Sequence, residues 1–235
     1  MISVVIPAYN EAKLIKGCLK ALKHQDYTGK YEIMVVDGGS DDGTQRTARK
    51  MGARVVAEYG KHKCPGNARN VGVSKSKYGI VAFIDADCVA YPNWLSRIEN
   101  DFNENVIAIG GIVRPHHGTW LDRLMFKLLS DWWVRVSAKL GTYQLYGNNC
   151  AYRKDKFLEI GGFDTDISFF EDTDLSMRIK KLGRIWIDKD LNVETSTRRF
   201  RKMGYAKLFW INTSAFFNSL TGKPITTKYF KAHKK

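Results

Sequence analysis

Apolar runs alternate with segments of helical spacing through the first half of this 235-residue chain, and this alternation limits the possible folds more than any other feature. The run Ile2–Ile6 is typical of a strand buried on both faces of a parallel sheet. Strands are predicted at 2–6, 31–36, 53–58 and 80–84, and helices at 14–22, 44–51, 67–77 and 92–102. This order predicts an open, mostly parallel α/β sheet flanked by helices.

The second half of the chain is less regular. Strands are predicted at 106–113, 147–152, 184–188 and 192–196, and helices at 121–140, 172–182 and 205–220. The sequence contains no internal repeat and no low-complexity linker. The economical interpretation is therefore one domain with a basic, aromatic C-terminal extension.

Polar clusters directly follow three of the predicted strands, at residues 8–11, 37–42 and 85–87. In α/β sheets of this kind, ligands bind beyond the carboxyl ends of the strands, so we expect one site at that edge. Asp85 and Asp87 lie one residue apart at a strand end. Their carboxylates suit Mg²⁺ or Mn²⁺, which would keep coordination positions for phosphate oxygens.

The residues around this pair of acids suit a nucleotide. Tyr9 could stack on a base, Glu11 could bond a ribose, and Asp37 could accept from a nucleobase N–H. Arg69 lies at the start of a helix, where a guanidinium and backbone N–H groups favour a pyrophosphate. Neither a GxxxxGK[ST] loop nor a GxGxxG turn occurs, so a metal would have to neutralise the diphosphate.

Taken in order, five motifs resemble those of the inverting family-2 glycosyltransferases, which have the GT-A fold. The motifs are Pro7-Ala8-Tyr9-Asn10-Glu11, Val36 to Thr44, Ala68-Arg69-Asn70-x-Gly72, Phe83-x-Asp85-Ala86-Asp87 and Glu171-Asp172. The segments Gly147–Arg153 and Gly161–Asp164 are similar to those that precede the acidic pair in that family.

The resemblance covers residues 2 to 200 and implies a GT-A domain over 1–200, built on a single Rossmann-like open mixed sheet flanked by helices. It divides this domain into a nucleotide-binding half at about 1–103 and an acceptor half at about 104–200. The remaining residues, 201–235, are expected to form an amphipathic helical extension.

The resemblance implies that a sugar moves with inversion from a UDP- or GDP-linked donor to an acceptor hydroxyl, with Mn²⁺ or Mg²⁺ as cofactor. It assigns Asp172 as the general base with Glu171 beside it, Asp87 as a metal ligand, and Asp85 to the ribose or a metal-bound water. The implied nucleotide-sugar contacts are Pro7, Ala8, Tyr9, Glu11, Asp37, Arg69, Asp85, Ala86, Asp87, Asn149, Arg198 and Arg199. The helix start is expected to favour the carboxylate form of Asp172.

Two of these assignments have alternatives, and so does the role of a pair of histidines. Many relatives carry two adjacent acids where this chain has Asp37-Gly38, so the carboxylate that contacts the base is either Asp37 or absent. Arg198 and Arg199 either close over the diphosphate or form a solvated run of charge. His116 and His117 either complete the metal shell or belong to an ordinary loop.

The formal net charge is +14, from 38 Lys and Arg against 24 Asp and Glu. This charge suits nucleic acid, anionic membrane or a phosphorylated small molecule, and also a merely soluble Lys-rich surface. Acidic clusters at three strand ends argue against nucleic acid.

The helix predicted at 121–140 either packs its Leu/Trp stripe on the sheet or lies on anionic lipid, where the acceptor glycan or sugar would be lipid-linked.

Cellular location and two further enzyme classes are also addressed by the sequence. Four widely spaced cysteines predict reduced cytosolic thiols, and no run approaches the roughly 18 to 20 apolar residues of a membrane span. We therefore expect a cytoplasmic protein, peripheral at the inner face of the cell membrane.

A polyprenyl-phosphate sugar synthase stays an alternative. A sugar-1-phosphate nucleotidyltransferase would normally show a glycine- and basic-rich first loop where this chain has Ala8–Glu11.

Overall fold

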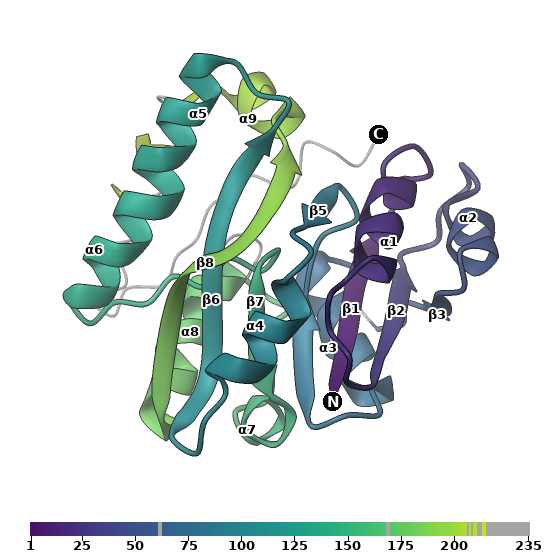
Figure 1. Ribbon diagram of the computed structural model, residues 1–235, viewed down its shortest axis with the longest axis horizontal. Coiled ribbons are helices and arrows are strands. Elements are labelled where there is room, and N and C mark those ends of the chain that lie inside the picture. Colours follow the sequence, from purple (N-terminus) through teal and green to yellow (C-terminus); the bar gives the residue numbers. More distant parts are fainter. Residues whose placement is uncertain (61–62, 168–169, 206, 208, 211–212, 215–235) are drawn as a thin grey trace.

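A single twisted sheet organises the computed structural model, which describes residues 1–60, 63–167, 170–205, 207, 209–210 and 213–214 (Figure 1). The strands are β1 Ile2–Ala8, β2 Tyr31–Asp37, β3 Arg54–Ala57, β4 Ile80–Phe83, β5 Cys88–Ala90, β6 Val106–His116, β7 Cys150–Arg153 and β8 Arg184–Ser196. They are ordered β3-β2-β1-β4-β7-β6-β8-β5. β7 runs antiparallel to β4 and β6, and β5 runs antiparallel to β8, whereas the other neighbours are parallel. The sheet is therefore mixed.

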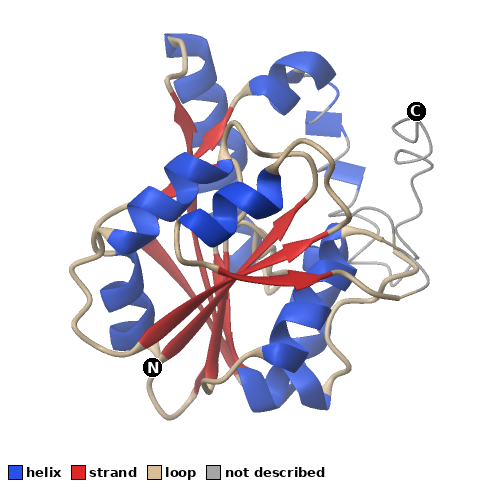
Figure 2. Cartoon of the chain, turned by 90° about the vertical axis from the view of Figure 1, so that its right-hand side faces the viewer, coloured by secondary structure: helices blue, strands red, loops and turns tan. Residues whose placement is uncertain are grey.

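Helices cover both faces of this sheet (Figure 2). They are α1 Ile15–Lys23, α2 Thr44–Lys50, α3 Pro65–Lys75, α4 Trp94–Asp101, α5 Trp120–Phe126, α6 Trp133–Lys139, α7 Lys154–Glu159, α8 Glu171–Ile179 and α9 Arg198–Met203, with a π-helical turn η1 Lys127–Trp132 and a 3₁₀ turn η2 Lys180–Leu182. Side chains of α1, α2 and α4 pack with Ile2, Val4 and Ile6 of β1. Side chains of α3, α7 and α8 pack with Val5 on the opposite face. Alternate residues of β1 thus belong to two separate apolar layers, as expected for a central strand.

Most predicted elements are present, and the differences have simple causes. β5 and α7 were not predicted, because three and six residues are too few to show a period. The two strands predicted at 184–188 and 192–196 form one 13-residue strand, β8, with irregular pairing to β6 between Gly110 and Ile112. Most of the predicted 201–235 extension, including much of the helix expected at 205–220, lies outside the described residues.

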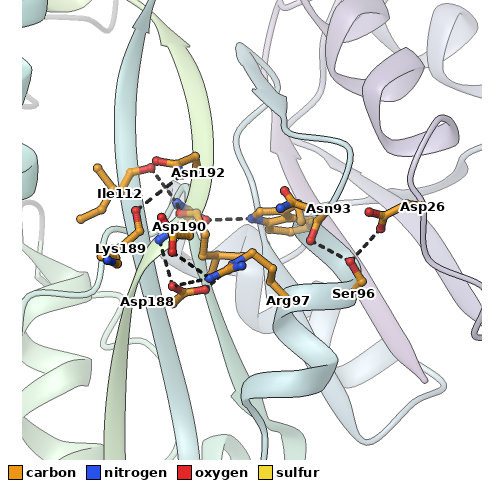
Figure 3. Close-up of polar contacts among 12 residues, drawn as sticks. Asp26, Asn93, Ser96, Arg97, Ile112, Asp188, Lys189, Asp190 and Asn192 are labelled. Carbon is orange, nitrogen blue, oxygen red and sulfur yellow. Dashed lines mark hydrogen bonds and ion pairs between the residues drawn. The ribbon is translucent and has the colours of Figure 1, made fainter.

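A polar network holds α4 against β8 (Figure 3). Arg97 donates through Nε and Nη2 to the two carboxylate oxygens of buried Asp188, at 2.6 and 3.0 Å, and Nη2 also contacts Asp190 at 3.2 Å. Ser96, the preceding residue of α4, donates to Asp26 at 2.7 Å. These contacts fix α4 between the two halves of the chain.

α5, η1 and α6 form a continuous helical stretch, here called the outer helix, along the edge of the molecule beside β6 and β8 (Figure 1). Its N-terminus is closed by a capping box between Thr119 and Asp122. The buried face of the outer helix carries polar as well as apolar residues. Its buried residues are Asp122, Phe126, Leu129, Ser130, Val134 and Ser137.

The opposite face of the outer helix carries a row of exposed apolar side chains, here called the apolar row: Trp120, Leu121, Leu124, Leu128 and Trp132. Trp120 is 73% exposed and Trp132 is 56% exposed. The alternative in which the whole Leu/Trp stripe packs on the sheet is therefore wrong. The prediction failed because the helix covers the sheet with serines, an aspartate and only some of its apolar residues.

Candidate active site

The loops that follow β1 and β2 are joined by hydrogen bonds. The backbone N–H of Asn10 donates to Ser40 Oγ, that of Glu11 to Thr44 Oγ1 and that of Ala12 to Asp42 Oδ2, each at 2.9 Å. Two of the three predicted polar clusters therefore meet at one edge of the sheet. The side chains of the second loop position the backbone of the first.

A buried arginine joins the third cluster to the acidic pair at the start of α8. Arg69 of α3 donates from Nη2 to Asp85 Oδ1 at 2.8 Å and from Nη1 to Glu171 Oε1 at 3.3 Å. Its side chain is only 4% exposed. Burial works against the guanidinium charge, but Asp85 and Glu171 outweigh it and raise the pKa of Arg69. A Cβ at Gly147 would lie 2.8 Å from the guanidinium, so this position needs a glycine.

Asp172 lies next to this bridge at the first turn of α8. The backbone N–H of Gly147 donates to its Oδ2 at 3.1 Å, and that of Thr173 donates to its Oδ1 at 2.8 Å. Desolvation and the neighbouring charge of Glu171 nevertheless raise the pKa of Asp172 to about 7. The backbone N–H donors do favour the carboxylate, as expected at a helix start, but together with Arg69 they do not offset these two effects.

A second arginine joins Glu11 to the acid that follows β4. Arg198, on α9, donates from Nη2 to Glu11 Oε1, and the same nitrogen lies 3.6 Å from Asp87 Oδ2. The other carboxylate oxygen of Glu11, Oε2, is buried and has no hydrogen-bond partner in the described part of the chain. The structure thus brings Glu11, Asp87 and Arg198 together, as expected of a site for a charged ligand. The side chain of Arg199 lies outside the described residues.

Tyr9 provides an exposed aromatic surface at the same edge. Its side chain is 65% exposed, and a Cβ at Gly38 would lie 3.5 Å from its Cδ2 atom. Ala8 and Ala86 are buried, and Pro7 lies within β1. The nucleotide contacts of these four residues stay predictions.

Family membership follows from comparison with known proteins. The model of the family described as Glycosyl transferase family 2 matches residues 3–159, more than half of the chain. The chain belongs to glycosyltransferase family 2. This confirms the family resemblance drawn from the five motifs.

Two curated relatives and one solved structure illustrate the extent of the family likeness. Glycosyltransferase AglE of Haloferax volcanii is 38% identical over 131 residues, which cover 52% of this chain and 43% of AglE. Undecaprenyl-phosphate 4-deoxy-4-formamido-L-arabinose transferase of Edwardsiella ictaluri is 31% identical over 149 residues, 59% of this chain and 45% of that protein. The chain thus spans less than half the length of these relatives.

The solved structure is that of mannosyltransferase PcManGT from Pyrobaculum calidifontis, in complex with GDP-Man and Mn²⁺. It has a TM-score of 0.72 at 24% identity, and the match covers 93% of this chain and 62% of PcManGT. This likeness confirms the predicted GT-A fold.

The structure shows the partners of two residues that were predicted to contact the nucleotide sugar, Asp37 and Asn149. Asp37 is buried, and its carboxylate accepts from the N–H groups of Gly39 and Ser40, from Ser40 Oγ and from Gln45 Nε2, so it closes its own turn. Asn149 is fully buried and bonds to Trp94, Ile112 and Leu191. Asn149 is closed off from a ligand by this burial, which corrects its predicted contact. Oδ1 of Asp37 accepts from Ser40 Oγ alone in the described part of the chain, so the contact of Asp37 with the base stays a prediction.

The histidine alternative is also resolved by contacts. His116 Nδ1 lies 2.6 Å from Glu194 Oε2, and the ring centroid of His117 lies 4.0 Å from that of His116. Among the described residues, no group of three or more His, Cys, Asp or Glu side chains could hold a metal ion. The two histidines thus form a local loop cluster with Glu194.

The sequence did not reveal which side chains Arg69 contacts. The contact of Arg69 with a pyrophosphate stays a prediction, and the structure adds that its guanidinium bridges two carboxylates. Gly147, which accommodates its guanidinium, was part of a quoted motif but had no assigned role. The requirement for glycine there comes from a contact 78 positions away along the chain, so local spacing cannot reveal it.

Proposed function

We propose that the chain is a metal-dependent inverting glycosyltransferase that moves a sugar from a nucleoside-diphosphate sugar to an acceptor hydroxyl. The arrangement that supports this most directly is the Asp85–Arg69–Glu171 bridge, which places Asp172 beside the acids that follow β4. Asp172 would receive the proton of the acceptor, and the acids that follow β4 would bind the diphosphate. The bridge connects these two groups, and the sugar carbon that is attacked would lie between them.

Because no group of three or more His, Cys, Asp or Glu side chains among the described residues could hold a metal ion, the acids that follow β4 would bind Mn²⁺ or Mg²⁺ together with the phosphate oxygens of the donor. Oδ2 of Asp87 lies 3.6 Å from Nη2 of Arg198, whose side chain is half-exposed, and Glu11, which pairs with the same nitrogen, has a buried Oε2 without a hydrogen-bond partner among the described residues. Oδ1 of Asp85 is bonded to Arg69, so we assign most of the coordination of the cation to Asp87. The cation would stabilise the negative charge of the departing diphosphate.

The remaining residues of the edge suit a UDP- or GDP-linked donor. Tyr9 presents an exposed ring on which a base stacks, while Glu11 accepts from ribose hydroxyls. Arg198, half-exposed between Glu11 and Asp87, is placed to donate to the phosphates. Asp172 accepts the proton of the acceptor hydroxyl, and the N–H groups of Gly147 and Thr173 hold its carboxylate in place, with Glu171 beside it.

The apolar row supports an acceptor presented at a membrane, such as a lipid-linked sugar or glycan. Arg123, Lys127, Arg135 and Lys139 are exposed on the same outer helix, and this combination suits the surface of an anionic bilayer. None of the helices in the described part of the chain is long and apolar enough to cross a membrane. We therefore propose peripheral attachment at the cytoplasmic face of the cell membrane. The name of the Edwardsiella ictaluri relative contains the lipid undecaprenyl phosphate, which agrees with an acceptor at a membrane and also with the polyprenyl-phosphate alternative.

The metal assignment is tested by Asp87→Ala. We expect this variant to bind UDP and GDP, each with Mn²⁺, roughly a hundredfold more weakly than the parent, because the diphosphate charge is left uncompensated. Titration calorimetry of each nucleotide with and without Mn²⁺ measures the loss. Asp26→Ala, which removes an exposed carboxylate after α1, serves as the control and should bind like the parent. Unchanged binding by Asp87→Ala would show that the metal assignment is wrong.

Membrane attachment is tested by flotation with vesicles of equal parts phosphatidylglycerol and phosphatidylcholine at low salt. We expect the parent to float, and the double variant Leu128→Ser/Trp132→Ser to bind at least about tenfold more weakly, because burial of each large apolar side chain contributes roughly 1.5–3 kcal/mol. Trp186→Ser removes an exposed tryptophan of β8 and should leave flotation unchanged. Failure of the parent to float would end the membrane proposal.

A further inference from the structure

α9 contacts two different parts of the molecule. Near its start, Arg198 reaches Glu11 and Asp87 at the candidate active site. One turn later, Arg201 reaches Asp122 on the outer helix, with Nη2 2.6 Å from Asp122 Oδ2, and Tyr205 donates from its hydroxyl to Asp122 Oδ1. The short helix therefore links the first turn of the outer helix to the acids that follow β1 and β4.

Asp122 is the fixed end of this link. It is 2% exposed, and it is held within its own helix by the capping box with Thr119, whose N–H donates to Oδ2 at 2.7 Å. The charge-assisted hydrogen bond from Arg201, followed by that from Tyr205, keeps the pKa of Asp122 well below its usual range. These hydrogen bonds outweigh the effect of burial, so Asp122 stays ionised and keeps Arg201 of α9 and Tyr205, which follows α9, as partners at physiological pH.

Arg198 itself has little else to hold it. Its side chain is 49% exposed, and ion pairs with this exposure are weak and depend strongly on how well the partners are placed beforehand. α9 has only six residues, too few to be stable without outside contacts. The placement of Arg198 must therefore come from contacts elsewhere on α9, and the contacts with Asp122 have the geometry for it.

We propose that Asp122 is a positioning residue that, through Arg201 and Tyr205, holds α9 so that Arg198 faces the diphosphate of the donor. This inference rests on the proposed function, since it concerns the same nucleotide site. In the competing interpretation, Asp122 merely caps the outer helix and its contacts with α9 have no effect on the nucleotide.

The two interpretations are separated by changing the α9 side of the contact, which leaves the capping box intact. The variants are Arg198→Gln, Arg201→Gln and the double variant, with Lys202→Gln as a matched control that removes one positive charge from the neighbouring exposed position of α9. Binding of UDP and of GDP with Mn²⁺ is measured by calorimetry on the full chain. Backbone hydrogen exchange over residues 197–203 is measured without nucleotide, and Tyr205→Phe provides a second, milder release of α9.

We expect Arg198→Gln and Arg201→Gln each to weaken binding of the preferred nucleotide about tenfold, and the double variant to bind no more weakly than Arg198→Gln alone. Exchange over 197–203 should become about tenfold faster in Arg201→Gln, and faster to a smaller extent in Tyr205→Phe. Lys202→Gln should stay within about twofold of the parent in both measurements.

Three results would overturn the inference: parent-like binding by Arg201→Gln, losses that multiply to about a hundredfold in the double variant, or unchanged exchange over 197–203. If the parent binds neither nucleotide, the proposed function fails. The exchange measurement still decides in that case whether Asp122 anchors α9.

Discussion

Asp172→Asn is expected to lower the turnover number by about 10²–10⁴-fold, because a carboxamide cannot accept the proton of the acceptor hydroxyl. The change is nearly isosteric, and Oδ1 can still accept the N–H of Thr173, so the start of α8 should keep its shape. Nucleotide binding with Mn²⁺ should stay within about threefold of the parent, since the group acts on the acceptor and not on the diphosphate. Release of nucleoside diphosphate under initial-rate conditions measures the effect.

The pH profile gives the same prediction a second measurement. The pKa of Asp172 is raised to about 7, and only its deprotonated form can act as a base. The parent rate should therefore be lost as the pH falls through about 7 and reach a plateau above it, while the residual rate of Asp172→Asn should lack this step. Asp174→Asn removes a carboxylate that pairs with Arg178 on the same helix, and it should keep the parent profile. An Asp172→Asn variant that retains most of its rate would instead favour a polyprenyl-phosphate acceptor, which hardly needs a base.

Arg69→Met is expected to reduce the free energy of unfolding by about 3–5 kcal/mol, because it leaves Asp85 and Glu171 as largely buried carboxylates without their cation. For a chain of this size, such a loss lowers the melting temperature by roughly 6–20 °C. Urea unfolding, followed by intrinsic fluorescence, measures the change at constant pH.

Two further variants test the cause of that loss. Arg69→Lys keeps one charge but cannot bridge two acids with a fixed fork, so we expect it to recover only part of the stability. Arg54→Met breaks a partly exposed pair with Glu32 and should cost about 1 kcal/mol or less. Equal stability of Arg69→Met and the parent would show that the bridge does not hold the site together.

The central part of the fold could be predicted because its sequence signals are local. The run at Ile2–Ile6 and its counterparts contain little but apolar residues, and a strand of this kind has to be buried on both faces. Polar residues at the ends of β1, β2 and β4 then had to meet at one edge, since parallel strands share their carboxyl ends. The contacts among Asn10, Glu11, Ser40 and Thr44 confirm that these clusters meet.

The failures concern what a residue contacts, and contacts between distant segments leave little trace in one sequence. Arg69 illustrates this, because its partners Asp85 and Glu171 lie 16 and 102 positions away along the chain. The outer helix shows a regular Leu/Trp period, and a period alone does not say which face turns inward. Buried Ser130 shows which face turns inward, because its Oγ accepts from the backbone N–H of Val113 on β6, and no pattern indicates this bond.

The two arginines at this edge have a consequence for how a donor is received. Arg69 of α3 and Arg198 of α9 each contact acids from two separate segments, so four carboxylates are brought together by cations that belong to the chain. Mutual repulsion among these acids is compensated during folding, before any ligand arrives. The site is in this sense pre-organised. The free energy needed to bring these like charges together is therefore not subtracted from the free energy of nucleotide binding.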